Sequence, residues 1–416
     1  MAGLYLGAFS IPVSNSGCTI AVGLLLLSSL LAMGDVVRET LREPLFWLIG
    51  GVVCYVLVYQ IWPQSFGPGP WSTTWDFLKA TFFWLTGYWF WVHRRHMARF
   101  MVTYALGFLV QSVLAFPWHH ALPALSGRYM VTLGFDHIVC GELAGLAAFV
   151  FLLTIPAATL GHAHRLAPWA GLGSLVAGLW SVYLLILTAS RSAWVATAVA
   201  ALLLAAVYMR DLWGALTRSR RLRHAVVAVV IGAGLIGAAT APMLKGRVTP
   251  IVQALSLYRQ HGESGLHDTS AGMRLRLLLF GAEAWAQRPV FGWGPSTAYS
   301  LIERQGLNEQ VSAGNRSTSL LNTPLQVLVE LGLVGAGLCL IIVFLLVRGV
   351  LACRRMPEFS GEVVLTVLAF LVYELVFSLF DVTFFLRGIA LILFGAGMAY
   401  ALAHASRTAE TPESHP

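Results

Sequence analysis

The stretch of sequence that decides the fold is residues 325–348, LQVLVELGLVGAGLCLIIVFLLVR, whose only polar side chains are Gln326, Glu330 and Arg348. As a helix, this run is long enough to cross about 30 Å of hydrocarbon. Similar apolar runs recur along the chain, and they are continuous rather than alternating. Because backbone polar groups must be satisfied inside lipid, continuous runs indicate helices and not a closed barrel.

We therefore predict an all-α polytopic membrane protein with about twelve transmembrane helices and one large helical periplasmic loop. The predicted spans are approximately residues 3–13, 18–34, 45–62, 75–92, 100–117, 136–160, 168–188, 193–209, 224–242, 325–348, 362–385 and 387–404. The first span is short, and it could join the second as one broken helix.

The composition favours the same fold class. The chain has 416 residues, of which 57% are hydrophobic and 11% are charged, whereas a soluble domain has roughly 25% charged residues. The shortage of charge extends along the whole length, which excludes a soluble body with a single anchor. The formal net charge of +8 comes from short clusters between apolar runs. This distribution favours membrane lipids over nucleic acid as the partner of the basic residues.

The basic clusters also predict the topology. With twelve crossings they all fall on one side, which the positive-inside rule makes cytoplasmic. These residues are Arg38, Arg42, Arg94, Arg95, Arg99, Arg165, Arg210, Arg218, Arg220, Arg221, Arg223, Arg348, Arg354, Arg355 and Arg407. Both termini are then cytoplasmic, in a bacterial inner membrane. The predicted parts are helices 1–9 (1–242), a periplasmic loop domain (243–324), helices 10–12 (325–404) and a cytoplasmic tail (405–416).

The long loop has a sequence typical of ordered structure. An amphipathic helix is predicted over residues 273–287, and Arg288-Pro289 ends it. The sequence Gly292-Trp293-Gly294-Pro295 predicts a turn, and residues 297–305 predict a second helix. A long, structured loop in a compact membrane protein is a natural place for function. The alternative is a disordered insert.

Arginines on the outer side suggest a phosphate ligand. Arg191 lies in a very short turn between two spans, where a cation needs an anionic partner or must extend to lipid headgroups. The loop adds Arg274 and Arg276, which are about 200° apart on a helix, so only one can face a given site. Arginine suits a diphosphate because its planar fork donates two hydrogen bonds and stays charged. The alternative is an ordinary solvated basic loop.

Other chemistry has weaker support in the sequence. None of the outer-side histidines, which include His137 and His267, has a second ligand at metal-binding spacing, so no metal site is predicted and no cofactor is expected. Glu374 is an acid within a predicted span. It indicates either a buried polar contact or a path for protons.

Three stretches together resemble the O-antigen ligase family, a group that also includes polysaccharide polymerases and protein O-oligosaccharyltransferases. Residues 187–194, LTASRSAW, resemble its serine-arginine signature between two central spans. Residues 272–275, GMRL, and 288–295, RPVFGWGP, are similar to its block of an arginine followed by a proline-glycine turn. Residues 322–335, NTPLQVLVELGLVG, resemble the signature that begins the helix after the large loop.

This resemblance implies a metal-independent glycosyltransferase. Such an enzyme moves a glycan from undecaprenyl diphosphate to a sugar hydroxyl of lipid A–core at the periplasmic face, in lipopolysaccharide biosynthesis. Arg191 and Arg274 would bind and neutralise the diphosphate leaving group, and Gly292 and Gly294 would let the backbone approach the ligand. Glu330 would fix neighbouring polar groups. The other residues predicted to bind substrate are Ser190, Arg276, Arg288, His137 and His267.

One position departs from the family pattern. Leu321 stands where the signature begins with the histidine expected to take the proton from the acceptor hydroxyl, and leucine has no titratable group. The chain could be a variant that only binds the donor. Another group, such as His267, His137 or Asn322 through water, could serve instead. Or the protein could be a polymerase-like relative in which a general base matters less.

Two other functions stay open at this point. An O-antigen or polysaccharide polymerase would use the same donor with a lipid-linked glycan as acceptor. A polysaccharide transporter or flippase belongs to a different class, but the chain lacks repeated halves and paired broken helices.

Overall fold

The computed structural model describes residues 1–61, 71–120, 130–154, 167–218, 220–262, 270–306, 319–381 and 386–410. In this part of the chain the regular elements are helices, and no strand is present. The prediction of an all-α protein is confirmed. His267, one of the predicted site residues, lies outside the described residues.

The helices lie where the apolar runs predict them. The first half contains α1 (Ala2–Ser10), α2 (Asn15–Leu31), α3 (Met33–Leu41), α4 (Pro44–Ile61), α5 (Trp71–Thr81), α6 (Phe83–Val92), α7 (Met97–Leu114) and α9 (His137–Phe149), with the π-helix η3 (Val150–Thr154) continuing α9. The second half contains α11 (Ala167–Leu187), α12 (Arg191–Arg218), α13 (Arg220–His261), α14 (Ser270–Gln287), α15 (Thr297–Arg304), α16 (Thr323–Cys353), α17 (Gly361–Ser378) and α18 (Leu386–Glu410).

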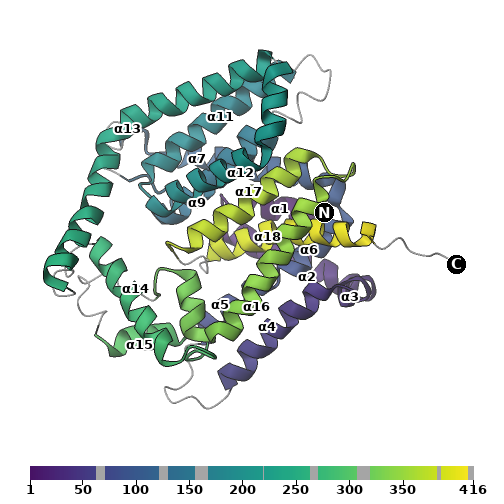
Figure 1. Cartoon of the computed structure of the whole chain (residues 1–416). Coiled ribbons are helices and arrows are strands. Elements are labelled where there is room, and N and C mark those ends of the chain that lie inside the picture. The colour runs from purple at the N-terminus through teal and green to yellow at the C-terminus, as the bar shows by residue number, and fades with distance from the viewer. Residues whose placement is uncertain are drawn as a thin grey trace.

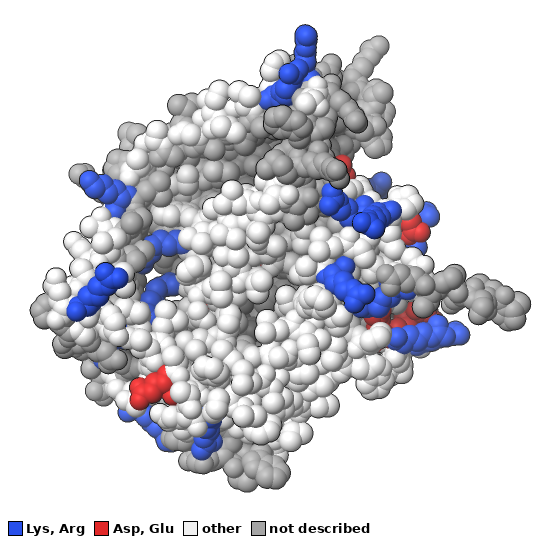
Figure 2. Space-filling view, viewed as in Figure 1, with Lys and Arg blue, Asp and Glu red and all other residues white. Residues whose placement is uncertain are grey.

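Several helices are suited to a membrane. Among the described residues, 5 are long and apolar enough to cross one, and the number rises to 6 if α2 and α3, which meet at 89°, form one bent span. The count of about twelve spans stays a prediction. Figure 2 shows charged side chains near the C-terminal end of the chain and again around α13, α14 and α15, with a broad uncharged surface between them.

The bundle is built around α18, which lies near its centre in Figure 1 and packs against α6 and α16. Small residues allow these helices to approach closely. A side chain on Gly397 would collide with Thr86 of α6, and one on Gly349 would collide with Ala403 of α18. Two other closely packed pairs are α12 with α17 and α9 with α11.

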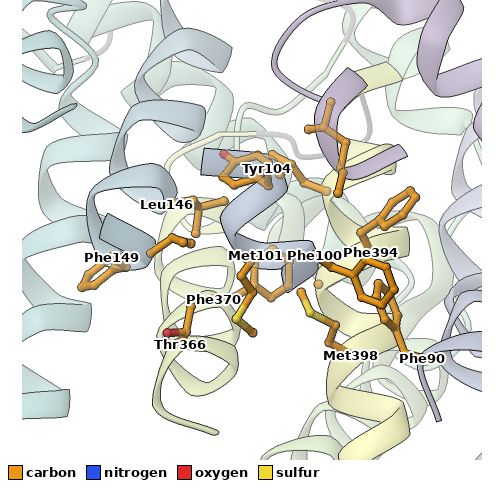
Figure 3. Close-up of a pocket in the computed structure, with 15 residues that line it drawn as sticks. Phe90, Phe100, Met101, Tyr104, Leu146, Phe149, Thr366, Phe370, Phe394 and Met398 are labelled. Atoms are coloured by element: carbon orange, nitrogen blue, oxygen red, sulfur yellow. The ribbon is translucent and has the colours of Figure 1, made fainter. Parts of the chain in front are cut away.

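The core also encloses a small apolar cavity of about 60 Å³ (Figure 3). Phe100, Phe370 and Phe394 are among the residues that line it, and Tyr104 and Thr366 contribute its only side-chain oxygens. The volume is far below that of a site for a drug-sized ligand, which is roughly 300–1,000 Å³. We interpret it as a packing void.

Helix α13 takes an unusual path. It runs from the end of α12 along the outside of the bundle and reaches the neighbourhood of α14 on a curved course (Figure 1). The helix has 42 residues, and it continues through residue 242, where the sequence predicts the start of the loop domain. Pro242 and Pro250 fall inside it, and each lacks the backbone N–H of a helical hydrogen bond. The proposed domain boundaries remain untested.

Both helices predicted within the long loop are present. Helix α14 ends at Gln287, immediately before Arg288-Pro289, and α15 begins after the turn that contains Gly292 and Gly294. Helix α18 likewise runs to Glu410, through the predicted start of the tail at residue 405.

Candidate active site

A cavity of about 380 Å³ opens where α9, α12, α13 and α14 meet the segment after α17. Its lining combines polar side chains from three distant parts of the chain with apolar ones. The polar lining consists of His137, Ser190, Arg191, Ser192 and Arg274. The apolar lining includes Val195, Leu255, Leu275, Leu278 and Phe380.

Arg191 is placed by a very tight turn. Helix α11 ends at Leu187 and α12 begins at Arg191. The chain reverses through Ala189, whose φ of 55° is left-handed, a conformation that costs energy for a residue with a Cβ. The Ser190 hydroxyl accepts a hydrogen bond from the Ala193 N–H at 3.4 Å and lies 3.1 Å from the Ser192 hydroxyl. Ser190 therefore caps α12, as an N-terminal serine commonly does.

This turn points the amino end of α12 at the cavity. The first N–H groups of a helix have no partner within the helix, and the helix dipole makes this end partly positive. Arg191 adds a full positive charge at the same place. The combination is a typical anion-binding arrangement.

Arg274 reaches the same cavity from α14. One Nη atom lies 3.5 Å from the Asp381 carboxylate, and the other donates to the Phe380 carbonyl oxygen. The Asp381 side chain is only 2% exposed, while that of Arg274 is 31% exposed. The buried carboxylate therefore holds the guanidinium, which still faces the cavity.

The start of α16 fixes the segment that carries Asp381. Asn322 caps α16 by accepting from the Leu325 N–H at 2.8 Å, and its side-chain N–H donates to the Leu379 carbonyl at 2.6 Å. The Thr323 hydroxyl donates to the Asp381 carbonyl at 2.9 Å. Four contacts, two from Arg274 of α14 and two from the start of α16, thus hold residues 379–381 beside the cavity.

Leu321 lies next to this corner but faces apolar neighbours. Its φ is 52°, and its side chain packs against a cluster that contains Leu277, Trp293 and Leu320. The residue is partly buried, and it does not line the cavity. Position 321 thus precedes the Asn322 cap and provides no group for proton transfer.

The glycine turn forms a separate unit against α16. Gly292 has a φ of 74°, and a Cβ there would lie 2.6 Å from the Glu330 carbonyl oxygen. The Trp293 and Gly294 N–H groups donate at 2.8 Å to the carbonyls of Val329 and Glu330. These carbonyls are released from helical bonding because α16 has a kink at Gly332, where φ is 64° and ψ is −167°.

Glu330 stabilises the same unit with its side chain. Its Oε1 accepts from the Ala298 N–H at 3.4 Å and from the Gln326 amide at 3.2 Å. Arg288 stacks on the Trp293 ring at 4.2 Å. These contacts support a structural role for Glu330, which connects α16 to the start of α15.

The structure brings together four of the predicted site residues, His137, Ser190, Arg191 and Arg274, in one cavity. Asn322 is linked to its edge through Leu379. Arg276 is absent from the lining, as the 200° separation predicts. Arg288, Gly292, Gly294 and Glu330 belong to the unit built on α16. In the described part of the chain, no group of three metal-ligating side chains is present.

Sequence reasoning missed two acids. Asp381 closes a long apolar run, where it resembles an ordinary helix end. Glu142 lies inside the predicted span 136–160, and an ionisable residue in such a run is by default a functional candidate. That signal was available for Glu142. For Asp381, only the tertiary contact with Arg274 shows its importance.

Comparison with known proteins is consistent with this site. Residues 176–340 match the family model described as O-antigen ligase. The match begins within α11 and ends within α16, so it contains Arg191, Arg274, the glycine turn and Glu330. A search of curated proteins found no match to the chain.

Proposed function

We propose, because residues 176–340 match the O-antigen ligase family model, that the chain transfers a glycan from undecaprenyl diphosphate to a sugar hydroxyl of lipid A–core. The reaction takes place at the periplasmic face of the bacterial inner membrane. The observation that carries the proposal is the meeting of Arg191, Arg274 and the amino end of α12 in one cavity. Two guanidinium groups and a helix end suit a diphosphate.

The chemistry needs stabilisation of the leaving group above all. A bond forms between the acceptor oxygen and the anomeric carbon, while the bond from that carbon to the diphosphate oxygen breaks. The diphosphate gains negative charge as it departs, so fixed positive groups contribute most in the transition state. Arg274 suits this role because Asp381 and the Phe380 carbonyl fix its orientation before the donor binds.

The apolar lining residues of the cavity favour the binding of a lipid-linked donor. Val195, Leu255 and Leu278 line the same cavity as the polar groups. Burial of a polyprenyl chain against this apolar surface would be favourable, whereas a soluble sugar nucleotide would leave the surface exposed to water. This combination supports a donor that carries both a diphosphate and a hydrocarbon chain.

Leu321 leaves the proton of the acceptor hydroxyl without the expected base. Of the three substitutes, His137 lines the cavity, and its ring Nδ1 lies 3.6 Å from the Asp136 carboxylate. Asn322 is occupied by its contacts at residues 325 and 379. His267 lies outside the described residues, so of the two substitutes that the structure describes, His137 is the favoured one for contact with the acceptor. A form that only binds the donor, or a polymerase, is the competing proposal.

The test is transfer by the purified protein, with undecaprenyl-diphosphate glycan as donor and lipid A–core as acceptor. We expect wild-type protein to form the glycan-bearing product and the Arg191→Ala variant to lose this activity while remaining inserted in the membrane. Arg191→Lys, which keeps the charge but not the planar fork, should retain part of it. Full activity of Arg191→Ala would remove this residue from the mechanism.

Glycan analysis of a deletion strain separates the alternatives. Loss of a ligase leaves polymerised glycan on undecaprenyl diphosphate and bare lipid A–core. Loss of a polymerase leaves lipopolysaccharide with a single repeat. Loss of a flippase strands the donor in the cytoplasmic leaflet. Only the first pattern agrees with the proposal.

A further inference from the structure

Two buried carboxyl groups meet beneath the candidate site. Glu142 belongs to α9 and Glu374 to α17, and their side chains are neighbours inside the bundle. Glu142 is 2% exposed. Its Oε1 and both carboxyl oxygens of Glu374 are buried, with no hydrogen-bond partner among the described residues. A buried polar group without a partner is unusual enough to need an explanation.

Among the described residues, no cation is recorded beside the pair. The titratable groups that face the pair are Tyr104 from α7, Cys140 from α9, Tyr373 from α17 and Asp381. All four are neutral or negative. The two tyrosine hydroxyls are directed to the carbonyls of Leu143 and Gly141, at 3.0 and 3.5 Å. Two bare carboxylates at this place would repel each other at great cost in a medium of low dielectric constant.

A proton shared by the pair removes this cost. In a singly protonated pair, one carboxyl donates to the other and the total charge is −1. Such a pair can also accept a second proton and become neutral. It therefore fits the binding of a proton better than that of a metal ion, which would require more ligands than two carboxyls.

Two sets of contacts connect the carboxyl pair to the residues of the cavity. Asp381 comes seven residues after Glu374, and Glu142 lies within its electrostatic reach. Helix α17, which carries Glu374, ends at Ser378, so Asp381 lies in the segment that follows it. Asp381 in turn contacts Arg274, which lines the cavity.

The second set of contacts is a seam of small residues between α9 and α12. Gly141 packs against Ser190 and Thr188, since a Cβ at Gly141 would lie 2.8 Å from the Ser190 Cβ. Gly145 packs in the same way against Thr197 and the Tyr373 hydroxyl. The seam thus joins the capping serine at the cavity to the phenol beside the carboxyl pair.

We propose that Glu142 and Glu374 form a proton store that receives the proton of the acceptor hydroxyl during glycan transfer. This inference rests on the proposed function and goes beyond it. As the acceptor oxygen bonds to the anomeric carbon and the diphosphate leaves, the hydroxyl proton passes through the groups at the cavity, His137 or Asp381, to the singly protonated pair. The pair becomes doubly protonated, and it returns one proton to the cavity after the products leave. Leu321 is then compatible with an active enzyme.

Glutamine variants provide the test, because an amide has the shape of a protonated carboxyl but cannot accept a proton. We expect Glu374→Gln and Glu142→Gln to slow transfer about 100-fold at neutral pH, the size of a typical contribution from general acid–base catalysis. We expect the wild-type rate to rise with pH as the doubly protonated pair loses one proton, and the two glutamine variants should lack this rise. The matched control is Glu362→Gln, which makes the same change in the first turn of α17, and it should behave as wild type. Full activity and an unchanged pH profile in the glutamine variants would overturn the proposal.

Infrared difference spectroscopy tests the shared proton without any transfer. Wild-type protein in nanodiscs should show the carbonyl band of a protonated carboxyl during a pH titration, and either glutamine variant should lose it. Absence of the band in wild type would overturn the proton store. If the band is present but wild-type protein transfers no glycan, the proposed function fails while the shared proton stands.

Discussion

Arg274 of α14 and Asp381, which follows α17, form an ion pair of 3.5 Å although 107 residues separate them in the sequence. The carboxylate is buried and the guanidinium is partly open to the cavity. This ion pair shows how the structure fixes the orientation of an arginine of α14 beside the cavity.

The two arginines of α14 should differ sharply. Arg274 lines the cavity and Arg276 does not. We expect Arg274→Ala to lower the transfer rate at least about 100-fold, as loss of a transition-state hydrogen-bond donor commonly does. Arg276→Ala is the matched control, because it removes an equal charge from the same helix. We expect its transfer rate to stay within about threefold of wild type, because Arg276 does not line the cavity. Steady-state transfer assays with purified variants measure both, and equal losses would contradict the proposed site.

Asp381 should act through the position of Arg274. Asp381→Asn removes the ion pair but keeps the size of the side chain, so Arg274 would lose its fixed orientation. We expect weaker binding of the donor, by about tenfold, which corresponds to about 1.4 kcal/mol. Glu358→Gln is the control, because that carboxylate pairs with Arg94 at 3.3 Å and is 62% exposed. Donor affinity measured with an undecaprenyl-diphosphate glycan should change in the first variant alone.

Restoring histidine at position 321 should raise activity. A histidine there could act as the missing base once its side chain turned from the apolar cluster around Leu321 toward the cavity, and polar residues of its kind tolerate a positive φ better than leucine does. We expect Leu321→His to increase transfer several-fold, with general-base catalysis as the reason. In a Glu374→Gln background the same change should restore part of the lost rate. No gain in either background would indicate that acceptance of the proton does not limit the reaction.

Gly292 should be far more sensitive than another glycine of similar backbone conformation. Gly292 and Gly306 have φ values of 74° and 64°, but only Gly292 has backbone atoms where a Cβ would be. We therefore expect Gly292→Ala to lower the unfolding temperature and to disturb the contacts with Val329 and Glu330. Gly306→Ala should cost only the conformational strain, about 1 kcal/mol. Thermal unfolding in detergent compares the two, and equal shifts would show that strain alone matters at Gly292.

Much of the site could be predicted from local sequence. The run LTASRSAW at residues 187–194 predicts a short turn with Arg191, and α11 and α12 are separated there by three residues, 188–190. The helical period predicts that Arg274 and Arg276 cannot face one site, and the lining of the cavity agrees. These features depend on neighbours a few residues apart, which is the range over which sequence patterns carry information.

Hydropathy by itself therefore determined that this chain is helical and apolar enough for a membrane, because an unpaired backbone is too costly in hydrocarbon. Only the tertiary structure decided which charges meet. It joined Arg274 to Asp381, brought Arg191 to the same cavity, and buried Glu142 beside Glu374. It also placed Gly292 and Glu330 in a structural unit on the α16 kink. Such contacts arise from the packing of helices that are distant in sequence, and no local pattern encodes their partners.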